Sequence, residues 1–277
     1  MDCTVVVPTF RGGNYISNLL RSLSKQSLRN FELIFVVKPS GDGTEDVLGS
    51  LSKRLGLVSN VLTQESGNVT SALRLGVMHA KGEIVLFTDD DAILPENWIE
   101  EHINAYSRFK NLGAVSGNIE NYSLSTNRVS ALETSRPVVK IYRRFVRRIV
   151  DLPIELLRDY RLGVFVTKDF RVVAGRNIPE KSCLSLPCRG VNLSFRNDAL
   201  NTVEFPFNML LRRYLYWEAY LGLQIVGAGW NSIYLPNISV YHIKRESLSR
   251  TKRRGEIRFE EKIMRNMFKE CLSKIRN

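Results

Sequence analysis

The feature that most constrains this chain is a short apolar run followed by three adjacent carboxylates. Residues 84–87 are Ile-Val-Leu-Phe, and Asp89, Asp90 and Asp91 follow after one threonine. Four consecutive apolar residues with β-branched and aromatic members predict a strand buried on both faces, as inner strands of parallel sheets are. Three adjacent acids repel one another, and a fold keeps them together mainly where a cation removes the repulsion. The pattern therefore predicts a ligand site at the carboxyl end of a buried strand, where open α/β sheets bind ligands.

The three carboxylates are expected to divide into two groups. Side chains alternate along an extended backbone, so Asp89 and Asp91 are predicted to point the same way and Asp90 elsewhere. Mg²⁺ and Mn²⁺ favour oxygen ligands, and Mg²⁺ usually takes one or two carboxylates and completes its shell with water and substrate phosphates. We expect Asp89 and Asp91 to hold one divalent cation, Mg²⁺ or Mn²⁺. The alternative is a solvated acidic turn that caps the helix after Pro95.

Strands and helices alternate through the first hundred residues. Predicted strands at residues 4–10, 31–37 and about 60–62 are separated by amphipathic segments, and a helix is predicted from about Asn68 to Ala80. This order indicates parallel βαβ units with right-handed crossovers. The fold class is therefore α/β, with a mostly parallel sheet flanked by helices. The first hundred residues resemble a nucleotide-binding half-sheet.

Composition limits the kind of protein and its partners. The 277 residues suffice for one large domain, and 44% hydrophobic content is ordinary for a globular protein. No apolar run has the length of a membrane span and the start lacks a signal-peptide pattern, so we expect a cytoplasmic protein. The four cysteines are expected to be reduced, with a Cys183–Cys188 bridge as the alternative. The net charge of +12 points to a polyanionic partner or an anionic membrane surface.

Several motifs occur in an order that resembles the family 2 glycosyltransferases. In the first half they are Val5–Phe10, Ser71–Gly76 with Ala80–Glu83, and Phe87–Asp91 with Pro95 and Trp98. In the second half they are Gly190–Arg196, Trp217-Glu218 with Gly229-Trp230, and Val240-Tyr241-His242. The resemblance covers roughly residues 3 to 243, and the ordered set is more specific than any single motif.

This resemblance implies a GT-A fold with Rossmann-like character, a nucleotide-diphosphate-sugar donor held through a divalent cation, and transfer with inversion at the anomeric carbon. It implies a catalytic domain over residues 1–245, divided into a nucleotide-binding half (1–118) and an acceptor-binding half (119–245). The acceptor is expected to be a glycan or a lipid-linked glycan. The residues expected to bind the nucleotide are Pro8, Thr9, Arg11, Lys38, Arg74, Asp89 and Asp90.

Two of these positions depart from the family pattern. Lys38 stands where an acidic residue usually contacts the base of the donor, and an ammonium group cannot accept a hydrogen bond from a uracil imide. The identity of the nucleotide is therefore left open. Arg74 stands where asparagine is common, and its guanidinium could bind a phosphate or a base edge.

Glu218 is the predicted general base. Inverting transfer needs a base on the acceptor side and an electrophilic group for the leaving diphosphate. Glu218 lies between aromatic residues at the start of an apolar helix, and partial desolvation there is expected to raise its pKa. The alternative is a surface acid paired with Arg212 or Arg213. His242 is expected to join the metal shell or contact the diphosphate, and the alternative is a buried structural histidine. Gly190, Asn192 and Trp217 are expected to line the donor-sugar or acceptor pocket.

Two basic segments complete the chain. Residues 136–161 alternate arginines with apolar residues, which predicts a helical insertion suited to an anionic lipid surface at the inner face of the membrane, or a core helix with a solvated arginine face. Residues 246–277 are expected to form a basic helical tail that docks on the catalytic domain, mediates self-association or adds to membrane attachment. The oligomeric state is left open.

Two other functions share part of this pattern. A sugar-phosphate nucleotidyltransferase would have the nucleotide-binding sheet and a metal-holding acid, but the loop Arg11-Gly12-Gly13 lacks a longer phosphate cradle and Glu218 would have no role. A basic nucleic-acid-binding protein ranks third, because the basic segments carry no aromatic stacking platform. We therefore expect no nucleic-acid partner.

Overall fold

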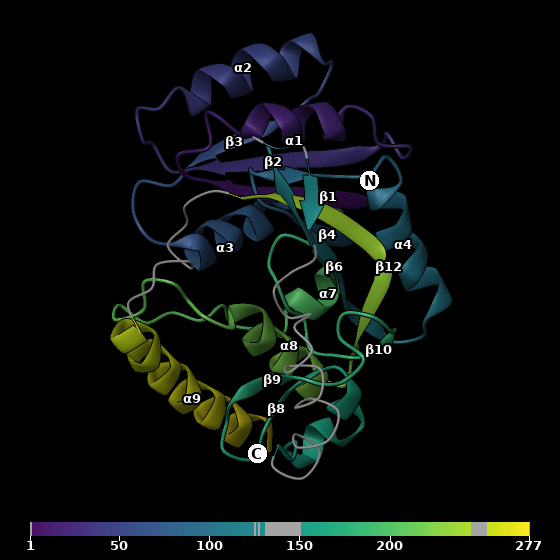
Figure 1. The fold of residues 1–277 in the computed structure, drawn as a ribbon, viewed down its shortest axis with the longest axis vertical. Coiled ribbons are helices and arrows are strands. Elements are labelled where there is room, and N and C mark those ends of the chain that lie inside the picture. Colours follow the sequence, from purple (N-terminus) through teal and green to yellow (C-terminus); the bar gives the residue numbers. More distant parts are fainter. Residues whose placement is uncertain (1, 125, 127, 131–150, 245–253, 277) are drawn as a thin grey trace.

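One mixed sheet runs through the molecule in the computed structural model (Figure 1). The structure describes residues 2–124, 126, 128–130, 151–244 and 254–276. Along the sheet the strand order is β10-β12-β6-β11-β4-β1-β2-β3, with β5 paired to β12 and β7 paired to β6. Neighbouring strands are parallel except at β10, β11 and these two side pairings. The predicted α/β class and mostly parallel sheet are confirmed.

The first half forms the predicted alternation of strands and helices. Its elements are β1 (Cys3–Thr9), α1 (Ile16–Leu23), β2 (Phe31–Val37), α2 (Thr44–Arg54), β3 (Asn60–Thr63), α3 (Val69–His79), β4 (Ile84–Phe87), β5 (Ala92–Ile93) and α4 (Trp98–Arg108). Helix α3 begins as expected, because the Asn68 side chain accepts hydrogen bonds from the backbone amides of Thr70 and Ser71. Strand β4 is buried at all four residues, as the apolar run predicts.

The second half adds strands to the same sheet and helices to one of its faces. Its elements are β6 (Leu112–Ser123), β7 (Arg128–Ser130), the 3-10 helix η3 (Glu155–Leu162), β8 (Val164–Val166), β9 (Val172–Ala174), β10 (Cys183–Leu184), β11 (Leu193–Arg196), α7 (Asn197–Leu200), α8 (Trp217–Gly227), β12 (Asn231–Ile243) and α9 (Arg254–Arg276). Strands β8 and β9 form a separate hairpin. The expected division at residue 118 falls inside β6, so both halves share one sheet.

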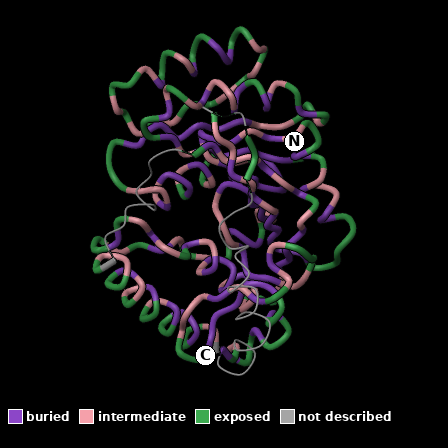
Figure 2. The backbone as a smooth tube through the Cα atoms, viewed as in Figure 1, coloured by how far each residue is buried: buried purple, intermediate pink, exposed green. Residues whose placement is uncertain are grey.

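The sheet separates two hydrophobic cores, and Figure 2 shows buried residues following its strands. Along β1, Val5 and Val7 face the core under α1, α2 and α4, whereas Val6 faces the core under α3, α8 and α9. This alternation is the period of two that a strand covered on both faces requires. The close fit leaves no room at Gly82, where a Cβ atom would collide with the backbone of Cys3.

The two basic segments have different outcomes. Most of the predicted 136–161 helix lies outside the described residues, and its described end is the 3-10 helix η3 rather than an α-helix. The predicted helical tail is confirmed as α9, and it packs against α8 through Met264, Phe268 and Leu272. None of the helices in the described ranges combines the length and apolar character that a bilayer crossing demands. The described cysteines are free thiols, so the alternative bridge between Cys183 and Cys188 is wrong.

Candidate active site

The loop after β4 directs Asp90 away from Asp89 and Asp91 as predicted, but it does so through a turn rather than an extended backbone. Asp90 is buried and accepts a short hydrogen bond from the Thr9 hydroxyl at the end of β1. Gly12 packs against both groups, because a Cβ atom there would collide with the Asp90 carboxylate and the Thr9 hydroxyl. Asp90 and Thr9 therefore fasten the ends of β1 and β4 together. Their predicted contact with a nucleotide stays a prediction.

Asp89, Asp91 and His242 come together although they lie far apart in the sequence. Strand β5 pairs antiparallel with β12, opposing Ala92 to His242, and the Ile243 amide donates to the Asp91 carbonyl oxygen over 3.0 Å. The His242 Nε2 atom then lies 2.9 Å from Asp91 Oδ1 and 3.9 Å from Asp89 Oδ2. One potential ligand atom from each residue lies within 4.8 Å of the others. Two carboxylates and an imidazole form a donor set that fits a divalent cation.

Asn192 holds the strand that carries His242. Its Nδ2 atom donates to the carbonyl oxygens of Asn118 (2.7 Å) and Ile238 (3.0 Å), and its Oδ1 atom accepts from the Trp98 indole over 2.8 Å. These bonds sit where the pairing of β12 with β6 jumps, so that residues 236–238 bulge out. The Asn192 side chain is completely buried. Asn192 therefore fixes the bulge, and its expected place in the donor-sugar or acceptor pocket stays a prediction.

Glu218 lies at the first turn of α8 with its carboxylate directed toward Gly190. The Gly190 amide donates to Glu218 Oε1 over 2.8 Å. Trp217 packs on Phe87 of β4 at 6.2 Å between ring centroids, and a Cβ atom at Gly190 would press on its indole. Gly190 thus permits the close approach that orients the base. Trp217 is almost fully buried and packs under this site. The expected place of Gly190 and Trp217 in the donor-sugar or acceptor pocket stays a prediction.

Desolvation raises the pKa of Glu218 from its ordinary value of 4.5 to about 7. The negative charge of Asp89 adds to the increase, while hydrogen bonds from backbone amides oppose it. The raised pKa agrees with the sequence-based expectation. The alternative of a surface ion pair is wrong, because the Arg213 guanidinium instead contacts Glu256 (2.7 Å) and Glu260 (3.4 Å) of α9.

Two cations predicted to bind the nucleotide surround an aromatic ring that sequence reasoning missed. The Phe10 ring, after Pro8 and Thr9, lies 5.1 Å from the Arg11 guanidinium carbon and 5.6 Å from Lys38 Nζ. Lys38 Nζ also donates to the Gly67 carbonyl oxygen over 2.9 Å. Phe10 is 42% exposed. Its exposure could not be predicted from the sequence, because a hydrophobic residue at the end of a strand pattern is usually expected to be buried. The ring and both cations thus occupy the carboxyl ends of β1 and β2.

Arg74 lies in a different surface hollow. This pocket of about 280 Å³ is formed by α3 residues, including Thr70 and Ser71, and by residues 205–207. A hydrogen bond from the Thr70 hydroxyl to the Pro206 carbonyl oxygen joins its two sides. The predicted role of Arg74 in nucleotide binding stays a prediction.

Comparison with known families agrees with this arrangement. The model described as "Glycosyl transferase family 2" matches residues 4–165, more than half of the chain. The chain belongs to the family 2 glycosyltransferases. The resemblance seen in the motifs is therefore confirmed. Glu218 and His242 lie beyond the matched residues, so their roles depend on the geometry above.

Curated relatives share the first part of this family 2 chain. The glycosyltransferase GlyG of Streptococcus pneumoniae is 30% identical over 122 residues, which is 44% of this chain and 40% of that protein. The poly(ribitol-phosphate) β-N-acetylglucosaminyltransferase TarS of Staphylococcus aureus is 31% identical over 103 residues, 36% of this chain and 18% of TarS. The chain thus spans less than half the length of these curated relatives.

Solved structures confirm the GT-A fold across almost the whole chain. TarS residues 1–349 of S. aureus in complex with UDP-GlcNAc align with a TM-score of 0.63 and 18% identity, covering 97% of this chain and 66% of that one. The mannosyltransferase PcManGT of Pyrobaculum calidifontis, in complex with GDP-Man and Mn²⁺, aligns with a TM-score of 0.57 and 18% identity, covering 93% of this chain and 59% of that one. At this identity the likeness establishes the fold.

Proposed function

We propose that this protein transfers a sugar from a nucleotide-diphosphate-sugar donor to a glycan or lipid-linked acceptor, with inversion of the anomeric centre. The observation that carries the proposal is the proximity of two chemically different groups. One is a half-buried carboxylate, Glu218, with a pKa near neutrality, and the other is the Asp89–Asp91–His242 cluster. The charge of Asp89 acts on Glu218, which supports their belonging to one site.

Glu218 is the proposed general base. With a pKa of about 7, a substantial fraction of its side chains is ionised at neutral pH and can accept the proton of an acceptor hydroxyl. The Gly190 amide leaves Oε1 hydrogen-bonded and fixes the orientation of the carboxylate. Deprotonation of the hydroxyl as it attacks is the step that a base on the acceptor face must perform.

Asp89, Asp91 and His242 are the residues proposed to hold a divalent cation. When bound, Mg²⁺ or Mn²⁺ would act as a Lewis acid that stabilises the charge of the departing diphosphate. The hydrogen bonds of the β5–β12 pair hold the Asp91 backbone beside His242, so the three side chains are positioned by the sheet. The Mn²⁺ named with the similar mannosyltransferase structure supports the use of a divalent cation.

The loop after β1 weighs against the alternative nucleotidyltransferase. The Gly12 amide donates to the Thr44 hydroxyl over 3.1 Å, and the Gly13 amide donates to the Asp42 carboxylate over 2.9 Å. Both amides therefore already bind groups at the start of α2. A phosphate cradle needs such amides directed at the ligand. An assay for pyrophosphate release from nucleoside triphosphate and sugar phosphate tests this alternative directly.

A thermal-shift panel tests the proposed donor and cation. UDP, GDP and their common sugar conjugates are tested with Mg²⁺, with Mn²⁺ and with chelator. We expect one nucleotide to raise the melting temperature only in the presence of the cation, because a ligand that binds the folded state stabilises it by mass action. Product NMR with the selected donor then reports the anomeric configuration. Retention, or cation-independent binding of every nucleotide, would contradict the proposal.

The proposed acceptor and the proposed membrane surface are supported by fewer observations than the donor is. TarS acts, by its name, on poly(ribitol phosphate), which supports a glycan-type acceptor in the family. Residues 131–150, which carry most of the basic pattern suggested for membrane contact, lie outside the described residues. Attachment to an anionic membrane surface and residence in the cytoplasm therefore stay predictions from the sequence. A vesicle sedimentation assay with anionic lipids tests the first of them.

A further inference from the structure

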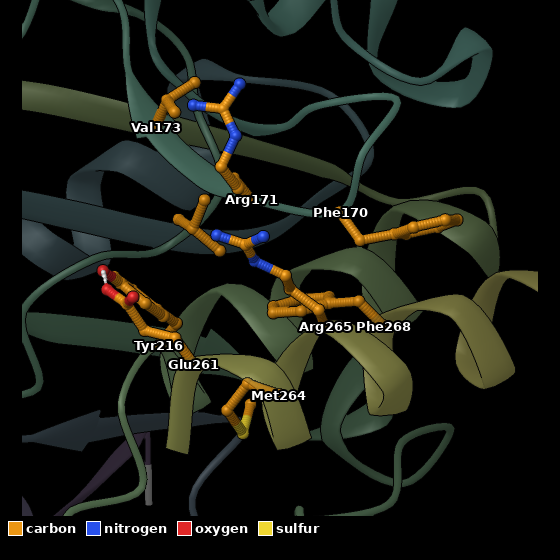
Figure 3. Close-up of a pocket in the computed structure, with 9 residues that line it drawn as sticks. Phe170, Arg171, Val173, Tyr216, Glu261, Met264, Arg265 and Phe268 are labelled. Atoms are coloured by element: carbon orange, nitrogen blue, oxygen red, sulfur yellow. Dashed lines mark hydrogen bonds between the residues drawn. The ribbon is translucent and has the colours of Figure 1, made fainter. Parts of the chain in front are cut away.

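A second pocket lies beside the helix that carries Glu218, between the β8–β9 hairpin, the start of α8 and helix α9 (Figure 3). Its volume is about 150 Å³. Pockets for drug-sized ligands span about 300–1,000 Å³, so this one has room for a single ring-sized group. The residues that matter here are Phe170, Arg171, Tyr216, Glu261, Arg265 and Phe268.

Three aromatic rings border the pocket, and two of them stand on an unusual backbone. Phe170 and Tyr216 have φ values of +60° and +64°, in the left-handed region that bulky residues seldom adopt. Backbone of this kind persists where the surroundings hold it, often at ligand-binding sites. The Phe268 ring is buried and fixed against Tyr220 of α8 at 5.7 Å between centroids. The pocket thus offers rigid apolar faces.

The charged groups of the pocket offer hydrogen bonds without an excess of positive charge. Arg171 is paired with two acids, Asp151 at 2.8 Å and Asp169 at 2.5 Å. Glu261 and Arg265 lie one turn apart on α9, and in Figure 3 both side chains point toward the pocket. Because these acids are at least as numerous as the cations, a phosphate would gain little there. An uncharged ring with several hydroxyl groups fits better.

Tyr216 connects the pocket with the proposed base. Its hydroxyl donates to Glu261 Oε1 over 3.3 Å, and it precedes Glu218 by two residues. Burial raises the pKa of Tyr216, and the negative charges of Glu261 and Glu218 raise it further. Tyr216 is the N-cap of α8, and Glu218 lies in the first turn of the same helix. The pocket therefore borders the start of the helix that carries the proposed base.

We propose that this pocket binds an uncharged sugar residue of the acceptor, adjacent to the residue that receives the transferred sugar. The apolar face of the sugar ring packs on the aromatic side chains, and its hydroxyl groups bond with Glu261 and Arg265. The proposal rests on the function proposed above and names part of the acceptor. Helix α9 lies beyond the residues that the family model matches. The proposed acceptor selectivity therefore depends on residues outside the part of the chain that defines the family.

Ligand-observed saturation-transfer NMR on the full chain tests this pocket with simple glycosides. The probes are methyl glycosides of neutral hexoses and N-acetylhexosamines, with glycerol phosphate as the anionic comparison. We expect at least one methyl glycoside to bind and Arg265→Ala to weaken its binding about tenfold or more, because a charge-assisted hydrogen bond is lost. Glu261→Gln should also weaken it. Arg258→Ala removes an exposed arginine of the same helix outside the pocket and should change nothing.

The outcomes separate this inference from the proposed function. It is overturned if no methyl glycoside binds, if neither Arg265→Ala nor Glu261→Gln weakens binding, or if glycerol phosphate alone binds. Donor turnover is measured on the same samples, as release of nucleoside diphosphate. This assay tests the proposed function independently of glycoside binding. Donor turnover without glycoside binding rejects only the pocket assignment, whereas absence of donor turnover in the parent rejects the proposed transferase. Arg265 is exposed, so its substitution leaves the folded state available for measurement.

Discussion

Replacing Glu218 by glutamine should remove activity and stabilise the protein at the same time. The pKa of Glu218 is raised from 4.5 to about 7 in the folded state, so the folded protein holds this proton more tightly than the unfolded chain does. A raised carboxyl pKa therefore lowers stability progressively as pH increases from about 4.5 to about 7. Each pH unit between the two values corresponds to about 1.4 kcal/mol. The full penalty above pH 7 is thus at most about 3 kcal/mol, since the half-buried carboxylate keeps some contact with water.

Glutamine has the same shape and accepts the hydrogen bond from Gly190, but it carries no charge. We expect Glu218→Gln to unfold at a higher urea concentration than the parent at pH 8, and the difference to vanish below about pH 4.5. Loss of the base should lower kcat by roughly 10²–10⁴-fold while donor binding persists. In the parent, kcat/KM should rise with pH and level off above about pH 7.

The activity measurement and the stability measurement test two different claims about Glu218. Transfer by the glutamine variant at the parent rate would show that Glu218 is not the base. A variant less stable than the parent at pH 8 would show that the carboxylate is not penalised by burial. Glu204→Gln, at an exposed acid, is the matched control and should alter neither measurement.

Three further predictions concern the cation site, the sheet and the tail. Asp91→Asn should abolish the Mn²⁺-dependent increase in melting temperature given by the donor nucleotide, measured by thermal shift; an unchanged increase would exclude Asp91 as a ligand. Gly82→Ala should lower the free energy of unfolding by about 1–3 kcal/mol in urea titration, because the added methyl group overpacks a well-filled region; an unaltered midpoint would contradict the close packing. Glu260→Ala should cost about 3 kcal/mol in the same assay, because it removes one partner of the buried Arg213. Limited proteolysis should then cleave α9 sooner than in the parent, and equal protection would argue against this docking contact.

The sequence predicted the sheet and the acidic cluster because both depend on local patterns. Buried strand β4 follows from the apolar run. The split between Asp90 and its neighbours was also predicted, although a turn at Asp89–Ala92 produces it rather than alternation along a strand. The raised pKa of Glu218 followed from the aromatic residues next to it in the chain. Each of these expectations needed only residues that are close in sequence.

Features that depend on distant contacts were not predicted. The bonds of Asn192 to Trp98, Asn118 and Ile238 join residues at least 46 positions apart, so its role in fixing the bulge leaves no local signal. The pocket on α9 escaped detection for the same reason, since it requires a hairpin and a tail helix to meet. The 3-10 geometry at Glu155–Leu162 replaced an α-helix although the apolar spacing suited one.

The bulge of β12 has a consequence for how this enzyme family can vary. Residues 236–238 bulge out of the ladder just before the strand reaches His242, and Asn192 binds one of their carbonyl groups. Shifting a strand by one residue turns its side chains to the opposite face. A single insertion or deletion in that bulge would therefore rotate the imidazole away from the aspartates while every ligand residue remained in the sequence. Metal dependence could thus be gained or lost among relatives through a length change in one short bend, which an inventory of the acidic motif alone would not detect.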